Sequence, residues 1–192
     1  MKRERPTRAE QGEATRANIV AAARRRFAAD GYERATIRAI AVDAGIDPSL
    51  VMRYFGNKEG LFVAAAEIDL RMPDLGTVPR RKLGAAVVEH FLQRWESDPI
   101  LQALLRTAAT NEPAAERMRA VWAGQPAPAL AAIGLDPRTA ATRAALISSQ
   151  LLGFAYSRWI LKLPPLAAMR RADAVQWLGP VIQQYLFGKI AS

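Results

Sequence analysis

Ser49 and Arg53 lie in a short segment whose side chains could hydrogen-bond to nucleic acid. An arginine can pair with both acceptor atoms of a guanine edge or hold a phosphate, and a serine hydroxyl can bond to either. Tyr54 could offer its hydroxyl to a phosphate while its ring packs, and Leu50 could touch a thymine methyl group or only pack. Arg38, on the outward face of the helix expected before this segment, could reach a phosphate or a base edge.

Two short helices joined by a tight turn, over residues 37–55, are expected to position these side chains. The first helix has an apolar stripe at helical spacing, formed by Ile37, Ile40, Ala41 and Ala44. Gly45 stands where a helix ends in a left-handed residue, and Asp47 with Pro48 is typical of the start of the next helix. With Val51 between the helices, the pattern predicts a helix-turn-helix, whose second helix enters the DNA major groove. On this stretch alone, an ordinary helical hairpin is the alternative.

The flanking residues add further features at fixed spacings. They are Ile19, Ala22 and Phe27, the Gly31-Tyr32 helix stop, Thr36, Ile40-Ala41 with Gly45, Tyr54-Phe55, Asn57-Lys58-Glu59 and Leu61-Phe62. In this order, residues 15–62 resemble the N-terminal domain of the TetR family of transcriptional regulators. The resemblance implies an all-α protein, with an N-terminal helix-turn-helix DNA-binding domain followed by a larger helical ligand-binding and dimerisation domain.

The same resemblance implies roles for individual residues. The N terminus of the helix that Thr36 opens would bind a phosphate, and Lys58 would meet the DNA backbone. Two positions depart from the family's pattern: Ser49 replaces its usual small residue, and Met52 replaces a common tyrosine, which removes a phosphate contact. The DNA-binding candidates are therefore Thr36, Arg38, Ser49, Leu50, Met52, Arg53, Tyr54 and Lys58.

The charge of the chain suits a polyanionic partner. Its 192 residues have a net charge of +9, and residues 1–29 hold a surplus of positive side chains next to the expected helix-turn-helix. Solubility alone is the alternative explanation. We therefore expect a double-stranded DNA partner and no membrane partner, because no apolar run approaches the roughly 20 residues that span a bilayer. A cytoplasmic location is expected, because no apolar stretch follows the charged N terminus as in a secretory signal.

Catalytic chemistry has little support in the composition. There is no cysteine, which excludes disulfides and thiolate metal sites, and His90 is the one histidine. The chain lacks an H-E-x-x-H pair, a phosphate-binding glycine loop and a G-x-S-x-G turn. We expect neither an enzyme nor a bound cofactor or metal.

The expected domains are a flexible basic arm at 1–12, the helix-turn-helix domain at 13–60 and the helical domain at 61–192. The arm could follow phosphates or be a plain solvated tail. The first helix is expected over 13–29, and a fourth helix over 58–71 is expected to connect the two domains mechanically. Prolines and a glycine interrupt the chain after that helix, at 72–79.

Three helices are expected over 80–96, 98–109 and 112–122, followed by a proline break at 125–128. A broken helix can open a cavity, although the break could equally be a helix end and a loop. The candidate pocket residues are Phe91, Trp95, Met118, Trp122 and Phe154, with ordinary core packing as the alternative. His90 is expected to be a satisfied or partly exposed histidine and not a ligand contact.

The last two helices, expected over 137–162 and 172–187, are richer in apolar residues than one small core requires. The resemblance implies a four-helix dimer interface here, with closure of the monomer's own bundle as the alternative. The candidate interface residues are Ile147, Leu151, Phe154, Arg158, Leu178, Ile182 and Tyr185. The expected function is a ligand-responsive repressor that binds a palindromic operator as a homodimer and responds to a small hydrophobic effector. The alternative is a helical small-molecule or lipid-binding protein without specific DNA recognition.

Overall fold

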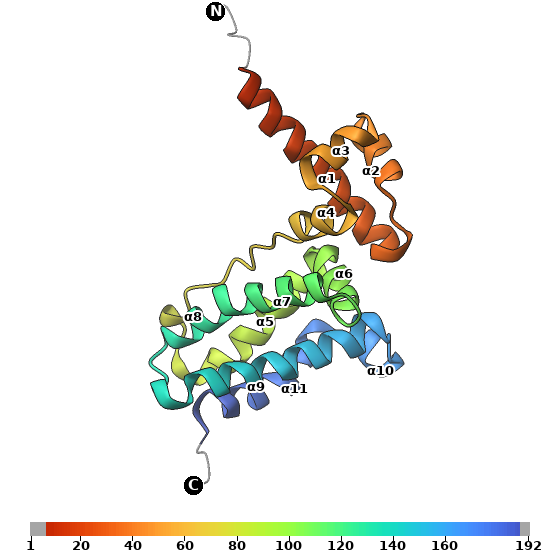
Figure 1. The fold of residues 1–192 in the computed structure, drawn as a ribbon. Helices are drawn as coiled ribbons and strands as arrows, with labels where there is room; N and C mark the ends of the chain where they lie inside the picture. Colours follow the sequence, from red (N-terminus) through yellow and green to blue (C-terminus); the bar gives the residue numbers. More distant parts are fainter. Residues whose placement is uncertain (1–6, 189–192) are drawn as a thin grey trace, which may run out of the picture.

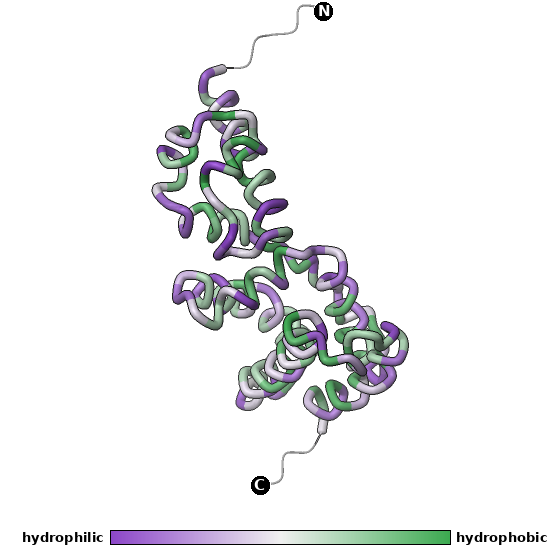
Figure 2. The backbone as a smooth tube through the Cα atoms, turned by 90° about the vertical axis from the view of Figure 1, so that its right-hand side faces the viewer, coloured by the Kyte–Doolittle hydropathy of each residue, from purple (hydrophilic) through white to green (hydrophobic). Residues whose placement is uncertain are grey.

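The computed structural model of the chain describes residues 7–188 except the side chain of Pro137. Within this range the chain forms helices and loops and no β-strand, which confirms the all-α prediction (Figure 1). The helices are α1 (Arg8–Arg34), α2 (Ile37–Ala44), α3 (Pro48–Phe55), α4 (Lys58–Ala65), α5 (Leu83–Ser97), α6 (Pro99–Ala108), α7 (Glu112–Gly124), α8 (Pro126–Ala131), α9 (Pro137–Ala155), α10 (Pro164–Ala167) and α11 (Arg171–Phe187). Figures 1 and 2 show α1–α4 as a head at one end of a larger bundle formed by α5–α11.

Helix α1 begins earlier than the sequence analysis expects. Residues 8–12, assigned to the flexible arm, are helical, and residues 1–6 of that arm lie outside the described residues. The cause is a capping box: Thr7 accepts a hydrogen bond from the backbone N–H of Glu10, and the Glu10 carboxylate accepts one from the N–H of Thr7 at 2.7 Å. The predicted stop at Gly31 is a kink, because Gly31 has a positive φ of 77° before one more turn.

Aromatic side chains hold the head together. The rings of Phe27 and Phe62 meet edge to face with centroids 5.0 Å apart, and Tyr32 packs edge to face on Phe62 at the same distance. Phe27 and Phe62 are fully buried, so α1 and α4 form a fixed base for the helix-turn-helix. Contacts of α1 with α6 and of α4 with α7 join this base to the bundle.

The fourth helix is shorter than expected. It ends at Ala65 instead of continuing to residue 71, and residues 66–74 run without regular structure; we call this segment the strap. Its backbone polar groups are satisfied by side chains from distant parts of the chain. The acceptors and donors are Ala65 O and Glu67 O with Arg24, Ala66 O with Arg117, Ile68 O with Gln125, Asp69 O with Arg94, Leu70 O with His90, and Leu70 N–H with Gln125. These tertiary bonds replace the helical ones, so a sequence able to form helix stays irregular here.

The bundle is organised around the pair α5 and α11, which share the most extensive helix–helix contact of the described chain. The two helices meet at Gly84 and Gly179, where a Cβ built on Gly84 would lie 2.6 Å from the backbone nitrogen of Gln183. Helix α9 packs beside this pair, and α8 packs against α7 and α9. The expected break at 125–128 appears as the junction between α7 and α8, and the last turn after α9 is a π-helix, Tyr156–Ile160.

Candidate nucleic-acid interface and interior cavity

The turn between α2 and α3 is fixed by backbone and side-chain hydrogen bonds. Gly45 has φ 66° and ψ 36°, and its N–H donates to the carbonyls of Ala41 and Val42. A Cβ at Gly45 would meet no atom within 4 Å, so the positive φ is what requires glycine there. From α1, the Asn18 side-chain amide donates to the carbonyl of Ala44 at 2.8 Å, which ties the turn to the base of the head.

Both short helices begin with a side-chain cap. Thr36 accepts from the backbone N–H of Ala39 at 3.1 Å, and Asp47 accepts from the backbone N–H of Ser49 at 2.7 Å. Hydrogen bonds from the Ser49 hydroxyl and backbone hold the pKa of Asp47 below its ordinary value. Val51 is fully buried between the helices, as the spacing predicts. Every local feature expected of the motif is therefore present.

The outer face of α3 presents polar and apolar side chains to solvent. Ser49, Met52 and Arg53 are exposed, whereas Leu50 and Tyr54 are half-buried. The Arg53 guanidinium lies over the Tyr54 ring, 5.9 Å from its centroid. This stacking leaves the N–H groups of Arg53 at the edge of the guanidinium free to donate to a bound group.

Four arginines of the head differ in whether they form ion pairs. Arg24 and Arg26 are occupied: Arg26 pairs with Asp43 at 2.6 Å, and Arg24 bonds to the strap and to Asp98 at 3.0 Å. Arg38 and Arg53 are exposed and form no ion pair within residues 7–188. The sequence analysis missed this structural role of Arg24, because its partners lie more than 40 residues away.

Lys58, expected to contact the DNA backbone, also makes contacts within the protein. Its ammonium donates to the carbonyl of Glu33 at 3.1 Å and lies 4.5 Å from the centroid of the Tyr32 ring. An ammonium has further N–H groups to donate, so this arrangement leaves capacity for a phosphate. The exposed Thr36 and Arg38 lie at the start of α2.

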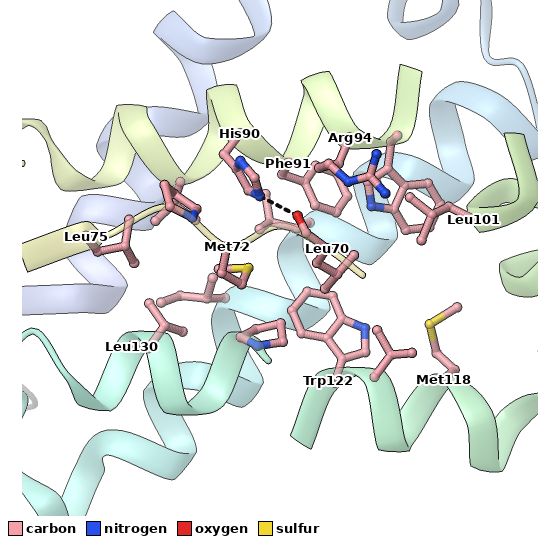
Figure 3. Close-up of a pocket in the computed structure, with 17 residues that line it drawn as sticks. Leu70, Met72, Leu75, His90, Phe91, Arg94, Leu101, Met118, Trp122 and Leu130 are labelled. Carbon is pink, nitrogen blue, oxygen red and sulfur yellow. Dashed lines mark hydrogen bonds between the residues drawn. The ribbon is translucent and has the colours of Figure 1, made fainter. Parts of the chain in front are cut away.

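A cavity of about 50 Å³ lies inside the bundle, with the strap as one of its walls (Figure 3). Phe91 and Trp95 from α5 and Met118 and Trp122 from α7 line it, as the sequence analysis expects. Phe154, the fifth expected residue, does not line this cavity; it is buried in the core, where it borders a separate groove with Ser157 and Leu166. The aromatic wall continues outward, because Trp95 stacks on Trp159 with centroids 5.7 Å apart.

Two polar side chains of α5 also reach the cavity wall. His90 bonds to the carbonyl of Leu70 at 2.9 Å, and because a carbonyl only accepts, the proton must sit on Nε2. Burial lowers the pKa of His90, so the neutral ring is favoured. Arg94 donates to the carbonyl of Asp69 at 2.9 Å and pairs with Asp98 at 3.3 Å. The sequence analysis missed Arg94, since nothing local distinguishes it from a surface charge.

The outer face of α9 and α11 differs from the expected dimer interface. Four of the expected residues are buried in the core of the single chain: Ile147, Leu151, Phe154 and Ile182. Arg158 is occupied too, since it bonds to two carbonyls near α10 and its side chain is 11% exposed. Leu178 and Tyr185 are half-buried. These positions form the stripe that closes the monomer's own bundle, so most of them cannot meet a partner.

The apolar residues that do face solvent are next to that stripe. We call the set of Leu146, Tyr156, Trp177 and Val181 the outer strip, and the Trp177 side chain is 72% exposed. Helices α9 and α11 pack against each other, and Arg143 of α9 donates to the carbonyl of Tyr185 in α11 at 2.7 Å. The outer strip therefore extends over α9, the π-helical turn that follows it and α11, as an exposed apolar patch with a partner would.

No helix in residues 7–188 is long and apolar enough to cross a membrane. Within the same residues, acidic and histidine side chains do not gather into a group that could hold a metal ion.

Comparisons with known proteins agree with this architecture. Residues 19–65 match the family model described as bacterial regulatory proteins, tetR family, and residues 82–186 match the model described as tetracyclin repressor-like, C-terminal domain. The second match alone spans more than half of the chain. No match was found among curated protein sequences.

Solved structures show the same fold. A TetR-family regulator from Streptomyces coelicolor A3 is 27% identical, with 96% of this chain and 99% of that one covered and a TM-score of 0.57. A TetR transcriptional regulator from Rhodococcus sp. RHA1 is 19% identical, with 95% and 99% covered and a TM-score of 0.62. A protein from Saccharomonospora viridis in complex with choline is 18% identical, with 90% and 97% covered and a TM-score of 0.66.

Proposed function

The chain belongs to the TetR family of DNA-binding transcriptional regulators, and from this premise we propose that it is a ligand-responsive repressor that binds a palindromic operator as a homodimer. The observation that supports the proposal best is the helix-turn-helix itself, with a buried Val51 and an exposed Ser49 and Arg53 on α3. The alternative, a small-molecule binder without DNA recognition, is not favoured, because both halves of the chain match regulator families. The repressor would act on the chromosome, in the cytoplasm.

We propose that α3 reads the major groove while the start of α2 meets the backbone. Arg38 and Arg53 are the exposed cations of these two helices, and neither forms an ion pair within the described residues. A helix N-terminus presents unpaired N–H groups, and those of α2 lie beside Thr36 and Arg38. Thr36, Ser49, Leu50, Met52, Tyr54 and Lys58 complete the proposed footprint.

Replacing Arg53 with alanine is expected to weaken operator binding by roughly 1 to 3 kcal/mol, because a base or phosphate contact is lost. The measurement is fluorescence anisotropy with the DNA upstream of the protein's own gene, at several salt concentrations. A base contact would relax specificity at one position, whereas a phosphate contact would lower the salt slope by about one. Arg138→Ala is the matched control, since it removes the same charge at an exposed site on α9.

Equal losses from Arg53→Ala and Arg138→Ala would contradict a specific role for α3. If the wild-type protein shows no sequence-dependent, salt-sensitive binding to this DNA at low micromolar concentration, the repressor proposal itself fails.

A small effector is proposed to bind in the bundle cavity, and the complex of the Saccharomonospora viridis protein with choline supports a small ligand for this fold. At about 50 Å³ the cavity is too small for a typical ligand, because ligand pockets usually measure roughly 300 to 1,000 Å³. A ligand must therefore displace a wall. We propose that the strap moves, since side chains rather than helical bonds hold it, and that Arg24 transmits the shift to α1 of the head. The ligand acts only through different affinities for the two arrangements.

Gln125→Ala is expected to loosen the strap, because the Gln125 amide donates to Ile68 O at 2.7 Å and accepts from Leu70 N–H at 2.7 Å. Each bond contributes about 1 kcal/mol, so the Leu70 amide should exchange with deuterium roughly 10- to 30-fold faster. Gln183→Ala is the control, because the Gln183 amide also accepts from one backbone N–H, that of Gly84, and donates to one carbonyl, that of Arg80, but away from the strap. Equal exchange at Leu70 in the wild type and in Gln125→Ala would show that other contacts hold the strap.

A further inference from the structure

One polar atom of a residue that lines the cavity has no hydrogen-bond partner within the described residues. The Nε–H of Arg94 is buried and makes no hydrogen bond within the described residues, although the terminal nitrogens of the same guanidinium bond to Ser97, Asp69 and Asp98. A buried N–H without an acceptor is costly, and the large majority of buried polar groups in native structures have a hydrogen-bond partner. In Figure 3 Arg94 lies next to Phe91 on α5, with Leu70 and Leu101 nearby.

The surrounding wall is otherwise apolar and contains no carboxylate. Its lining residues are aliphatic, aromatic and proline side chains with the exceptions of His90 and Arg94. The nearest acid, Asp98, is already shared by two arginines, since Arg24 pairs with it at 3.0 Å and Arg94 at 3.3 Å. Two positive charges against one negative charge leave this end of the cavity positive. An organic cation would meet a like charge with no counter-ion.

We propose that the cavity takes an apolar ligand carrying one hydrogen-bond acceptor, neutral or anionic, which the Arg94 Nε–H recognises, and that it rejects organic cations. This rests on the proposed function of the cavity as the effector site. The ligand's apolar body replaces the wall contacts of Leu70 and Met72 as the strap yields, while its acceptor satisfies the unpaired N–H. Because a ring-sized molecule needs a cavity of roughly 150 Å³, binding and displacement of the strap are one event.

The test uses four ring-sized probes of matched shape: acetophenone, benzoate, cumene and phenyltrimethylammonium. Methyl-labelled methionine reports on the site by NMR, because Met72 and Met118 line the cavity. Acetophenone and benzoate are expected to shift these two methyl signals in a saturable way, and phenyltrimethylammonium is not. If phenyltrimethylammonium binds as tightly as the two acceptors, or if neither acceptor binds, the proposal is overturned.

The second part of the experiment separates the contribution of the Arg94 hydrogen bond from that of apolar contacts with the probe. Cumene has the shape of acetophenone without its acceptor, so the ratio of their dissociation constants measures the acceptor's contribution. In Arg94→Leu the preference for acetophenone over cumene is expected to fall about tenfold, which is the effect of losing one charge-assisted hydrogen bond. In Arg158→Leu it should not move, because Arg158 also has a buried, partnerless Nε but does not line the cavity. An unchanged ratio in Arg94→Leu overturns the proposal; if that variant does not fold, the four probes on the wild type decide it.

Operator affinity is measured with and without acetophenone in the same samples. Binding in the cavity with no change in operator affinity would refute the effector role and leave the ligand class standing.

Discussion

Placing glutamate at Leu146 and Trp177 is expected to separate the proposed dimer and to lower operator affinity by about 10²- to 10⁴-fold, while each head stays folded. That range is the usual gain when two linked sites bind together. Both side chains are exposed in the single chain, 44% for Leu146 and 72% for Trp177, so the substitutions create no cavity and bury no charge within it. Their expected effect is confined to the contact with a second copy.

The outer strip has the properties of such a contact. A tryptophan buries roughly 150–250 Å² when covered, and aromatic residues concentrate most of the energy of protein interfaces. Trp177 and Val181 are one turn apart on α11, and Leu146 lies on the neighbouring α9. A two-fold pairing of these helices would fix the distance between two heads, as a palindromic site requires.

The charge of the variant requires its own control, because two added glutamates weaken attraction to DNA without any effect on assembly. Ala120→Glu with Ala123→Glu changes the net charge equally at exposed positions of α7. The oligomeric state is measured by sedimentation and operator binding by anisotropy. A Leu146→Glu, Trp177→Glu variant that stays dimeric, or a wild type that is monomeric at micromolar concentration, would remove the outer strip from the interface.

The head could be predicted well because its signals are local. Gly45, Asp47 and Pro48 each act within a few residues of the turn they specify, and Val51 follows at a spacing that needs no distant partner. The same holds for helix starts in the bundle, where Pro99 and Pro126 stand at or near the first helical position. The N-terminal arm shows the limit of this reasoning, since the capping box of Thr7 and Glu10 was overlooked, although both residues are visible in the sequence.

The strap could not be predicted, because the interactions that hold it are distant in sequence. Residues 58–71 have good helix formers, yet the helix ends at Ala65. Arg24, 41 residues from Ala65, and Gln125, 57 residues from Ile68, hold the irregular backbone there. The unpaired Nε of Arg94 is equally invisible in the sequence, because its significance depends on the cavity around it.

Most of the residues expected at a dimer interface are buried in the single chain, for a different physical reason. Helical periodicity finds the most apolar stripe of α9, formed by residues such as Ile147 and Leu151, but a helix in a dimeric bundle has two apolar faces. The stronger stripe closes the monomer, and we propose that the weaker one beside it, marked by Leu146, meets a partner. Periodicity alone does not say which face is which, whereas the exposed fraction of each side chain does.

Replacing Gly84 with alanine is expected to lower the free energy of unfolding by about 2 to 3 kcal/mol, although alanine is the better helix former. Its Cβ would meet the backbone of Gly179 and lie 2.6 Å from the backbone nitrogen of Gln183, and backbone atoms cannot turn aside as a flexible side chain can. The helices α5 and α11 must therefore move apart. Urea unfolding followed by circular dichroism measures the loss.

Gly124→Ala is the matched control for the helix propensity of alanine, because a Cβ on Gly124, at the end of α7, meets no atom within 4 Å. It should be neutral or stabilising by up to about 1 kcal/mol. Equal effects of the two substitutions would show that α5 and α11 can accommodate a Cβ at Gly84 without moving apart.

The Gly84 substitution should also weaken operator binding, even though it lies in the bundle and not in the head. Gly179, the residue it would push, stands between Trp177 and Val181 on α11, so a displaced α11 carries the outer strip with it. If the two chains pair through that strip, the spacing of the two heads changes and the palindrome no longer fits. A Gly84→Ala protein that is destabilised yet binds its operator as tightly as the wild type under native conditions would separate the α5–α11 crossing from the geometry of the dimer.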